Sequence, residues 1–233
     1  MNSDKLSRRL ECVASYIPKE STLADIGSDH AYLPCYCVKQ GIASFAVAGE
    51  VVKGPYLSAL SHVKELDLEK QIQVRQGDGL EVISQGEVDC ITIAGMGGSL
   101  ITSILENGKE KLPGVKRLIL QPNVGSIHIR KWCQKNNWEI IAEQILEEDG
   151  KIYEVIVADY VLKHPEKLSA PELLMGPFLI REKSNVFQQK WNAEVKQWKS
   201  ILQKLNEASE TKELEEKKNE LKTKIAYVEE VLS

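Results

Sequence analysis

The chain has 233 residues, of which 42% are hydrophobic and 27% charged, enough for one sizeable globular core and a smaller appendage. Lysine and arginine total 30 and aspartate and glutamate total 34, which gives a net charge of -4. This balance excludes a polybasic protein that binds nucleic acid through bulk charge, and leaves open binding through a local basic patch.

The cysteines and the amino-terminal segment indicate a cytoplasmic protein. None of the five cysteines belongs to a Cys-x-x-Cys pair and their neighbours are mostly apolar, so we expect reduced, largely buried thiols and no metal site. The first residues lack a secretory apolar region, and no apolar run approaches the roughly 18 residues that cross a bilayer. We therefore expect no membrane association.

Residues 1–162 alternate between strand and helix patterns. Leu6, Leu10, Val13, Ala14 and Ile17 predict an amphipathic opening helix that Pro18 ends. After it we expect strands at 22–26, 44–50, 71–76, 88–94 and 116–121, and helices at 31–40, 55–66, 99–107 and 126–136. Strands joined by helices predict crossover units and a parallel sheet.

The segment 138–160 breaks this alternation. Two strand patterns flank Asp149 and Gly150, a dipeptide that favours a tight hairpin turn. A doubly wound parallel sheet that ends in an antiparallel hairpin is typical of class I methyltransferases. We therefore expect an α/β, Rossmann-like methyltransferase domain over residues 1–162.

Residues 163–233 contain no strand patterns, and their net charge is +1, whereas that of residues 1–162 is -5. Three prolines in 164–177 predict a linker without regular structure. From Phe187 onwards apolar residues recur every three or four positions, which predicts two antiparallel helices with a break at 206–210, although Lys218 occupies an apolar position. This coiled-coil-like helical domain either packs mainly on itself or is an arm that contacts a large partner.

The first predicted strand runs into the sequence ADIGSDHAYLP (24–34), a strand, glycine turn and helix start of the kind that binds nucleotide-like ligands. A dinucleotide site requires G-x-G-x-x-G, but here Asp29 follows Gly27 by two positions. A carboxylate there would repel two phosphates and attract the ammonium and sulfonium groups of S-adenosylmethionine. The cofactor-binding candidates in this loop are Asp25, Gly27, Ser28, Asp29 and His30.

Three further strand ends carry candidate cofactor-binding residues. Glu50, followed by Val51, ends the second strand 25 residues after Asp25, where a carboxylate accepts ribose hydroxyl protons. Asp78 and Gly79 follow the third strand and are placed to meet the adenine amino group, and the fourth is followed by Gly95, Met96 and Gly97. The alternatives are that Glu50 is a solvated acid, that Asp78 and Gly79 form a plain turn and that residues 94–98 form a tight connection. Four such features at successive strand ends nevertheless favour a cofactor site.

With these motifs the sequence resembles the TrmK family, which are bacterial tRNA methyltransferases that modify N1 of adenine 22. The resemblance extends over essentially the whole chain, and its most specific motifs are DIGSDHAYLP (25–34) and AGMGG (94–98); QGDGL (76–80), LILQPN (118–123) and the GP (176–177) that precedes Phe187 and Trp191 add to it. It implies methyl transfer from S-adenosylmethionine to an adenine of the tRNA D-arm. It also implies a Rossmann-like domain followed by a coiled-coil-like domain.

The substrate adenine has its N1 atom on the Watson–Crick edge, so we expect it to be turned out of its stack into a pocket. Asp29, His30, Tyr32 and Asn123 are the catalytic candidates, and Gln121 joins them as a residue that holds the base. Three plainer interpretations stay open, namely that His30 caps a helix, that Tyr32 belongs to the core and that Asn123 is a turn residue.

The tRNA phosphates require positive charge, which this acidic chain offers only locally. Lys5, Arg8 and Arg9 on the opening helix are the predicted tRNA contacts; Arg130 with Lys131 and the tail lysines Lys190, Lys196, Lys199 and Lys204 are further basic groups. We expect a monomer without a protein partner. The competing hypotheses are a small-molecule or protein methyltransferase, a non-catalytic protein that binds the cofactor and tRNA, and, more distantly, an NAD oxidoreductase.

Overall fold

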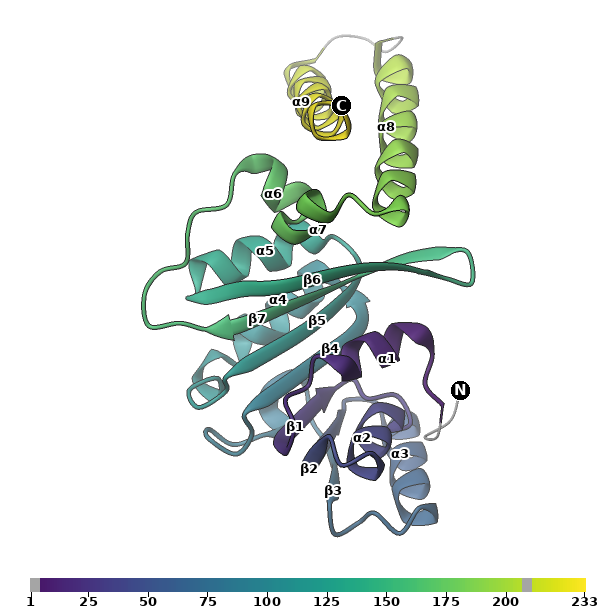
Figure 1. Ribbon diagram of the computed structural model, residues 1–233, viewed down its shortest axis with the longest axis vertical. Coiled ribbons are helices and arrows are strands. Elements are labelled where there is room, and N and C mark those ends of the chain that lie inside the picture. Colours follow the sequence, from purple (N-terminus) through teal and green to yellow (C-terminus); the bar gives the residue numbers. More distant parts are fainter. Residues whose placement is uncertain (1–4, 207–210) are drawn as a thin grey trace. The chain divides into compact units, whose positions relative to one another are not determined.

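The computed structural model describes residues 5–206 and 211–233 and divides into two compact units, Met1–Lys167 and Leu168–Ser233 (Figure 1). The division falls inside the predicted linker of 164–177. The predicted break between the tail helices, at 206–210, lies largely outside the described residues.

The first unit alternates strands and helices as expected. Its helical elements are α1 (Arg8–Ser15), α2 (Tyr32–Lys39), α3 (Lys53–Glu65), η1 (Gly79–Val82), α4 (Gly98–Asn107), η2 (Lys109–Lys111) and α5 (Ser126–Lys135). Its strands are β1 (Ser21–Ile26), β2 (Ala43–Glu50), β3 (Ile72–Gln76), β4 (Cys90–Gly97), β5 (Arg117–Val124), β6 (Trp138–Glu148) and β7 (Lys151–Tyr160).

The seven strands form one sheet in the order β3-β2-β1-β4-β5-β7-β6. The first five are parallel to one another, whereas β7 is antiparallel to both β5 and β6. The chain turns between β6 and β7 at Asp149 and Gly150, both of which have positive φ. The parallel sheet and its terminal hairpin are therefore confirmed.

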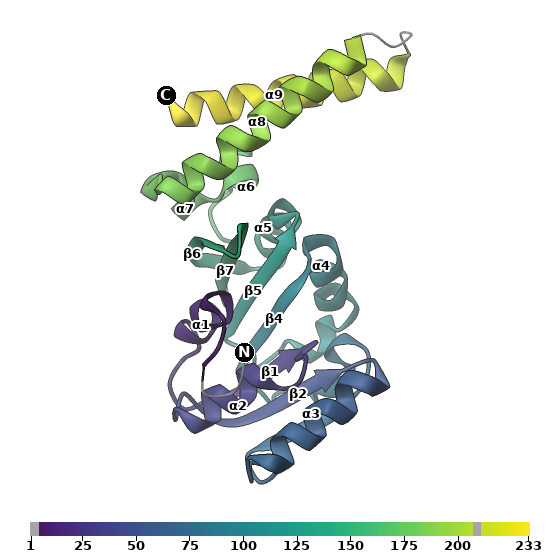
Figure 2. The same ribbon diagram turned by 90° about the vertical axis from the view of Figure 1, so that its right-hand side faces the viewer.

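Alternate residues of each strand face opposite sides of the sheet, and helices cover both sides (Figure 2). In β1, Leu23 packs with apolar residues of α1, α2 and α3, while Ala24 and Ile26 pack with those of α4 and α5. Both faces of β1 are covered, and Leu23, Ala24 and Ile26 supply its apolar contacts. Asp25 lies among them as a buried acid.

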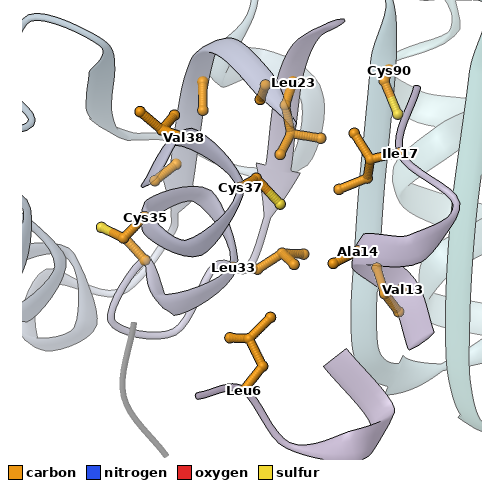
Figure 3. Close-up of a cluster of buried hydrophobic side chains, with 14 of the residues drawn as sticks. Leu6, Val13, Ala14, Ile17, Leu23, Leu33, Cys35, Cys37, Val38 and Cys90 are labelled. Carbon is orange, nitrogen blue, oxygen red and sulfur yellow. The ribbon is translucent and has the colours of Figure 1, made fainter. Parts of the chain in front are cut away.

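The opening helix α1 belongs to the core of the first unit. Figure 3 shows Ala14 of α1, and Ile17 just after this helix, on the side that faces Leu33 and Cys37 of α2, and Val13 belongs to the same buried cluster. Four of the five cysteines are buried and all five are free, as the sequence predicts. Burial is the largest influence on the Cys35 thiol and raises its pKa to about 12, so this thiol stays protonated and packs as an apolar group.

Arg130 does not contribute to a basic surface, contrary to the expectation from sequence. It is 0% exposed and lies between two buried carboxylates. Arg130 Nε is 2.7 Å from Glu143 Oε1, and Arg130 Nη2 is 2.6 Å from Glu154 Oε2. Its helix α5 packs against β6, the strand that carries Glu143, so the guanidinium joins α5 to the hairpin.

The second unit is helical and contains α6 (Ala170–Met175), α7 (Pro177–Glu182), α8 (Asn185–Asn206) and α9 (Lys212–Leu232). The expectation of an irregular linker over 164–177 is wrong in its second half. Ser169 accepts from the Glu172 N–H at the start of α6, and Pro171 and Pro177 occupy first-turn positions, where the missing N–H has no helical partner to lose. The prolines therefore begin helices here.

Helices α8 and α9 contact each other, and α9 also contacts α6. Lys218 of α9 is 6% exposed, and its Nζ lies 2.8 Å from Glu215 Oε1. The lysine thus occupies the apolar stripe and pairs its charge with a residue one turn away. No helix within residues 5–206 and 211–233 has both the length and the apolar composition required to cross a membrane.

Candidate cofactor and active site

The site lies where the carboxyl ends of β1, β2, β4 and β5 meet. The loop between β1 and α2 turns sharply, since Gly27, Asp29, His30 and Ala31 all have positive φ. The Gly27 and Ser28 N–H groups both donate to the Gly49 carbonyl of β2, at 2.9 and 3.2 Å. Three successive non-glycine residues in this strained region are the kind of backbone found at functional sites.

Asp25 is a buried carboxylate at the floor of this loop. Ser28 Oγ donates to Asp25 Oδ2 at 2.6 Å, and Thr92 Oγ1 donates to Asp25 Oδ1 at 2.6 Å. Burial is the largest influence and raises the pKa of Asp25 to about 6; the two hydroxyls favour the charged form, as does the charge of Arg9, while that of Glu50 opposes it. The group is held ready for a cationic partner.

Glu50, at the end of β2, is 6% exposed and accepts the Asp29 N–H. Burial, the largest influence, raises the pKa of Glu50, whereas the bond from the Asp29 N–H lowers it. The Asp29 side chain points outward and is 77% exposed. The two acids therefore have different environments, since the Glu50 side chain is buried against the loop and the Asp29 side chain is exposed to solvent.

Two cavities share Gly27 and Met96 as lining residues. The larger, about 310 Å³, is polar and includes Asp25, Ser28, Asp29, Gly95 and Asn123; the smaller, about 150 Å³, includes Val51, Asp78, Gly79, Leu100 and Ile104. A Cβ added to Gly27 would lie 2.2 Å from Met96 Cε, so the methionine lies directly against the glycine. The Met96 side chain therefore marks the boundary between a polar and a more apolar compartment.

A hydrogen-bonded network shapes the turn that follows β4. Gln121 is fully buried, and its Oε1 accepts the Gly95 N–H at 2.9 Å. Gln121 Nε2 donates to Asn123 Oδ1 at 3.4 Å, and Asn123 Nδ2 donates to the Gly95 carbonyl at 2.7 Å. Gly95 has a φ of 79°, which L side chains rarely adopt, so the glycine and its two amide partners together fix this turn.

His30 and Tyr32 form an aromatic group with His62 of α3. The His30 and Tyr32 rings are 5.4 Å apart and stacked, and the Tyr32 and His62 rings meet edge to face at 4.9 Å. His62 Nδ1 is 2.7 Å from the His30 carbonyl oxygen. No side chain caps α2, whose N-cap is Ala31, so His30 is not a helix cap. Tyr32 is half-buried and packs against the core as well.

The remaining candidates are more exposed. Asp78 is exposed, and its N–H donates to Glu81 Oε2 at 3.2 Å at the start of η1, while Val51 is 56% exposed. Arg8 is exposed and donates from Nη1 to the Glu147 carbonyl at 3.2 Å, and Lys5 is also exposed. A Cβ added to Gly97 would meet nothing within 4 Å, whereas a Cβ on its neighbour Gly98 would lie 2.2 Å from the Gly125 carbonyl oxygen.

The sequence did not reveal every residue of the site. Thr92 is a polar residue in an otherwise apolar strand, and this interruption is a signal that could have identified it. Tyr153 of β7 also lines the larger cavity, and His62 completes the aromatic group. These two come from segments without a local motif, so only the fold brings them to the site. Leu33, a further lining residue, lies inside the motif of 25–34 but was not among the candidates.

A still larger cavity, about 520 Å³, is lined by residues that include Lys109, Pro113, Trp138 and Tyr160. It lies near the start of β5 and β6 and the end of β7, the other end of the parallel strands from the glycine loop. Open α/β sheets bind ligands at the carboxyl ends of their strands, where the predicted residues converge. Size alone therefore does not identify the site.

The sheet order, the antiparallel hairpin and the acidic strand ends define a Rossmann-like methyltransferase. Two solved structures share this fold at 11% and 12% identity, the METTL16 MTase domain and TrmN from Thermus thermophilus, each with a TM-score of 0.55. The sequence profile of the tRNA (adenine(22)-N(1))-methyltransferase family, TrmK, matches residues 23–230. The chain belongs to this family.

Two relatives match this chain over nearly their full length. The tRNA (adenine(22)-N(1))-methyltransferase of Bacillus subtilis is 51% identical, with 100% of this chain and 99% of that protein covered. Its crystal structure has a TM-score of 0.94 and covers 99% of this chain and 100% of that one. Sp1610 of Streptococcus pneumoniae, solved with S-adenosyl-L-methionine, is 44% identical, with a TM-score of 0.88 and coverage of 98% and 100%.

Proposed function

We propose that this chain transfers the methyl group of S-adenosylmethionine to N1 of adenine 22 in the D-arm of tRNA. Family membership supports the reaction, and the observation that carries the site is the buried Asp25 carboxylate at the floor of a polar cavity. A phosphate-bearing dinucleotide would meet carboxylates in this loop. A ligand with a sulfonium and an ammonium group meets complementary charge instead.

The two cavities suit the two ends of such a ligand. The compartment of about 150 Å³ with Val51, Leu100 and Ile104 suits an adenine ring, whose amino group would meet Asp78. The compartment of about 310 Å³ suits the charged amino-acid end, and Asp25 is placed for its ammonium group. Glu50, between them along the strand ends, is placed for the ribose hydroxyls.

We assign the substrate adenine to the mouth of the larger cavity. Asp29 and Asn123 both line it and both are exposed, so they can reach a base that enters from outside. Gln121 is buried, and we assign it the role of holding Asn123 and Gly95 in place. The stacked rings of His30 and Tyr32 are partly exposed beside Asp29 and offer a surface on which a base can stack.

The reaction needs little acid–base chemistry from the protein, because neutral adenine N1 already carries a lone pair. When bound, S-adenosylmethionine supplies an electrophilic methyl group on a sulfonium sulfur. The site residues orient N1 and exclude water, and oriented proximity contributes up to roughly 7–11 kcal/mol to lowering such a barrier. Methylation leaves a positive charge on the base, and the negative Asp29 carboxylate stabilises this charge. No proton has to be removed for methyl transfer.

Three further proposals concern the tRNA contacts, the helical unit and the oligomeric state. We propose that Lys5 and Arg8 contact tRNA phosphates, that α8 and α9 form a coiled-coil-like arm that contacts tRNA, and that the protein acts as a cytoplasmic monomer. Reversing both charges, with Lys5→Glu and Arg8→Glu together, should weaken tRNA binding and leave the affinity for S-adenosylhomocysteine unchanged. Unchanged tRNA affinity would contradict the first role. Sedimentation of the purified chain tests the last.

The function is tested by incubating the protein with methyl-labelled S-adenosylmethionine and unmodified tRNA transcripts, followed by nucleoside analysis. We expect labelled 1-methyladenosine in the RNA. Asp29→Ala should abolish its formation, and Asp149→Asn, an exposed change in the β6–β7 turn, should not. Absence of 1-methyladenosine from every transcript, or label found only in small metabolites, would overturn the proposal.

A further inference from the structure

A side chain from α3 holds the second half of the loop between β1 and α2. His62 Nδ1 lies 2.7 Å from the His30 carbonyl oxygen. A carbonyl oxygen only accepts hydrogen bonds, so this ring nitrogen carries the hydrogen and donates it. The His62 ring also meets the Tyr32 ring edge to face at 4.9 Å, and Tyr32 in turn stacks on His30. His62 therefore contacts one partner of this stack through a hydrogen bond and the other through its ring.

The backbone of this half of the loop needs such support. Asp29, His30 and Ala31 have φ values of 40°, 65° and 55°, a region that is unfavourable for residues with a side chain. A backbone of this kind persists only where the surrounding contacts impose it. Here the Asp29 N–H donates to Glu50 of β2, and the His30 carbonyl accepts from His62 of α3. Two side chains from two different elements thus hold the strained residues.

The first half of the loop is anchored separately. The N–H groups of Gly27 and Ser28 both donate to the Gly49 carbonyl, at 2.9 and 3.2 Å. Ser28 Oγ donates to Asp25 at 2.6 Å. These bonds tie the cofactor side of the loop to β1 and β2. A change at His62 should therefore act on the residues assigned to the substrate adenine, with little effect on the cofactor side.

We infer that His62 is a positioning residue for methyl transfer, whose Nδ1–H donor fixes the His30 carbonyl and with it the surface that receives the adenine. In this role His62 acts through His30 and touches neither the methyl donor nor the base. The inference rests on the proposed function and deepens it, because it adds a residue that holds the substrate side of the site in shape.

Two variants separate the donor from the ring. Asparagine has an amide N–H at the same number of bonds from Cα as histidine Nδ1, so His62→Asn keeps the donor and loses the ring. His62→Phe keeps a ring edge towards Tyr32 and loses the donor. The assay is transfer of labelled methyl from S-adenosylmethionine to unmodified tRNA transcripts, with kcat and the KM for tRNA measured separately. Calorimetry with S-adenosylhomocysteine reports on the cofactor side.

His62→Phe should lower kcat about tenfold and leave the KM for tRNA within about twofold of wild type, the size expected when one hydrogen bond to the backbone is lost. His62→Asn should keep kcat within about threefold of wild type. Both variants should bind S-adenosylhomocysteine with wild-type affinity. His164→Asn, the same change at an exposed position, is the control and should have the wild-type kcat.

A measurement on the wild-type protein tests the donor directly and does not require either variant to be active. Nitrogen NMR of protein with isotope-labelled histidine, near about pH 8.5 where an ordinary imidazole is neutral, should show the His62 hydrogen on Nδ1. The His62 signal is identified by its absence from the variants. A hydrogen on Nε2 instead would overturn the inference, because Nδ1 could then not donate to the His30 carbonyl.

Three kinetic results would also overturn it. Wild-type kcat in His62→Phe would mean that the donor is not needed, and an equal loss in both variants would mean that the ring matters instead. A loss of affinity for S-adenosylhomocysteine in parallel with kcat would mean that His62 supports the whole site and not its substrate side. If the wild-type protein methylates no transcript, the proposed function fails instead, and the NMR measurement still decides whether His62 holds the loop.

Discussion

Replacement of Asp25 by asparagine should stabilise the ligand-free protein at neutral pH while removing its cofactor affinity. Burial raises the pKa of Asp25 from 3.8 to about 6. Between these values the unfolded chain loses the proton while the folded chain keeps it, so folding becomes less favourable as pH rises. Above about pH 6 both states are ionised and the loss is complete. A neutral amide escapes this cost.

The magnitude follows from 1.36 kcal/mol for each tenfold change in proton affinity. The raised pKa of Asp25 should cost the fold about 3 kcal/mol near pH 7.5, where both states are ionised, and about 1 kcal/mol near pH 4.5, where the folded group is still protonated. The stability advantage of Asp25→Asn should therefore grow by about 2 kcal/mol between these pH values. Comparing two pH values cancels any change in the bonds from Ser28 and Thr92 that is independent of pH.

The assay is urea unfolding of the full chain at both pH values, followed by hydrogen exchange of peptides from β1 and β4. These peptides report on the first unit alone. Asp149→Asn, the same chemical change at an exposed turn, is the control and should show no such growth. A difference between wild type and Asp25→Asn that does not change with pH would refute the reasoning.

Three further predictions follow from charges and close contacts. Binding of S-adenosylhomocysteine should weaken about tenfold between about pH 7.5 and about pH 5, as Asp25 with a pKa of about 6 becomes protonated; calorimetry that finds no pH dependence would contradict this. Arg130→Met should lower the free energy of unfolding by about 3–5 kcal/mol, because two buried carboxylates lose their cation, and urea titration measures it; a loss below about 1 kcal/mol would argue against the buried network. Lys218→Met should raise the stability of the helical unit by about 1 kcal/mol in thermal melts, and a clear decrease would show that the Glu215 pair is net stabilising.

The element order and the strand-end candidates could be predicted because they depend on local patterns. Continuous apolar runs bounded by glycine turns gave the parallel strands, and Asp149 with Gly150 gave the hairpin. The ends of β4 and β5 extend about three residues beyond prediction, to Gly97 and Val124, because Met96 pairs with Pro122 and Gly97 with Val124 in an irregular register. Glycine and proline are unfavourable in strands, so a prediction from residue preferences ends both strands too early.

Residues whose roles depend on long-range contacts could not be predicted in this way. Arg9 and Arg130 both resemble surface cations in the sequence, but the first lines the cavity and the second is buried between two acids on the hairpin. Nothing in their neighbours marks this difference. In contrast, the start of α6 has a local signal in the sequence, since Ser169 followed by Glu172 is a capping box.

The most direct test of the central claim uses two tRNA transcripts that differ only at position 22, adenine in one and guanine in the other. Each is incubated with the protein and S-adenosylmethionine and then read by primer extension, which stops at a base methylated on its Watson–Crick edge. We expect a stop at position 22 in the adenine transcript and none in the guanine transcript. Stops at another adenine in both transcripts, or none in either, would contradict it.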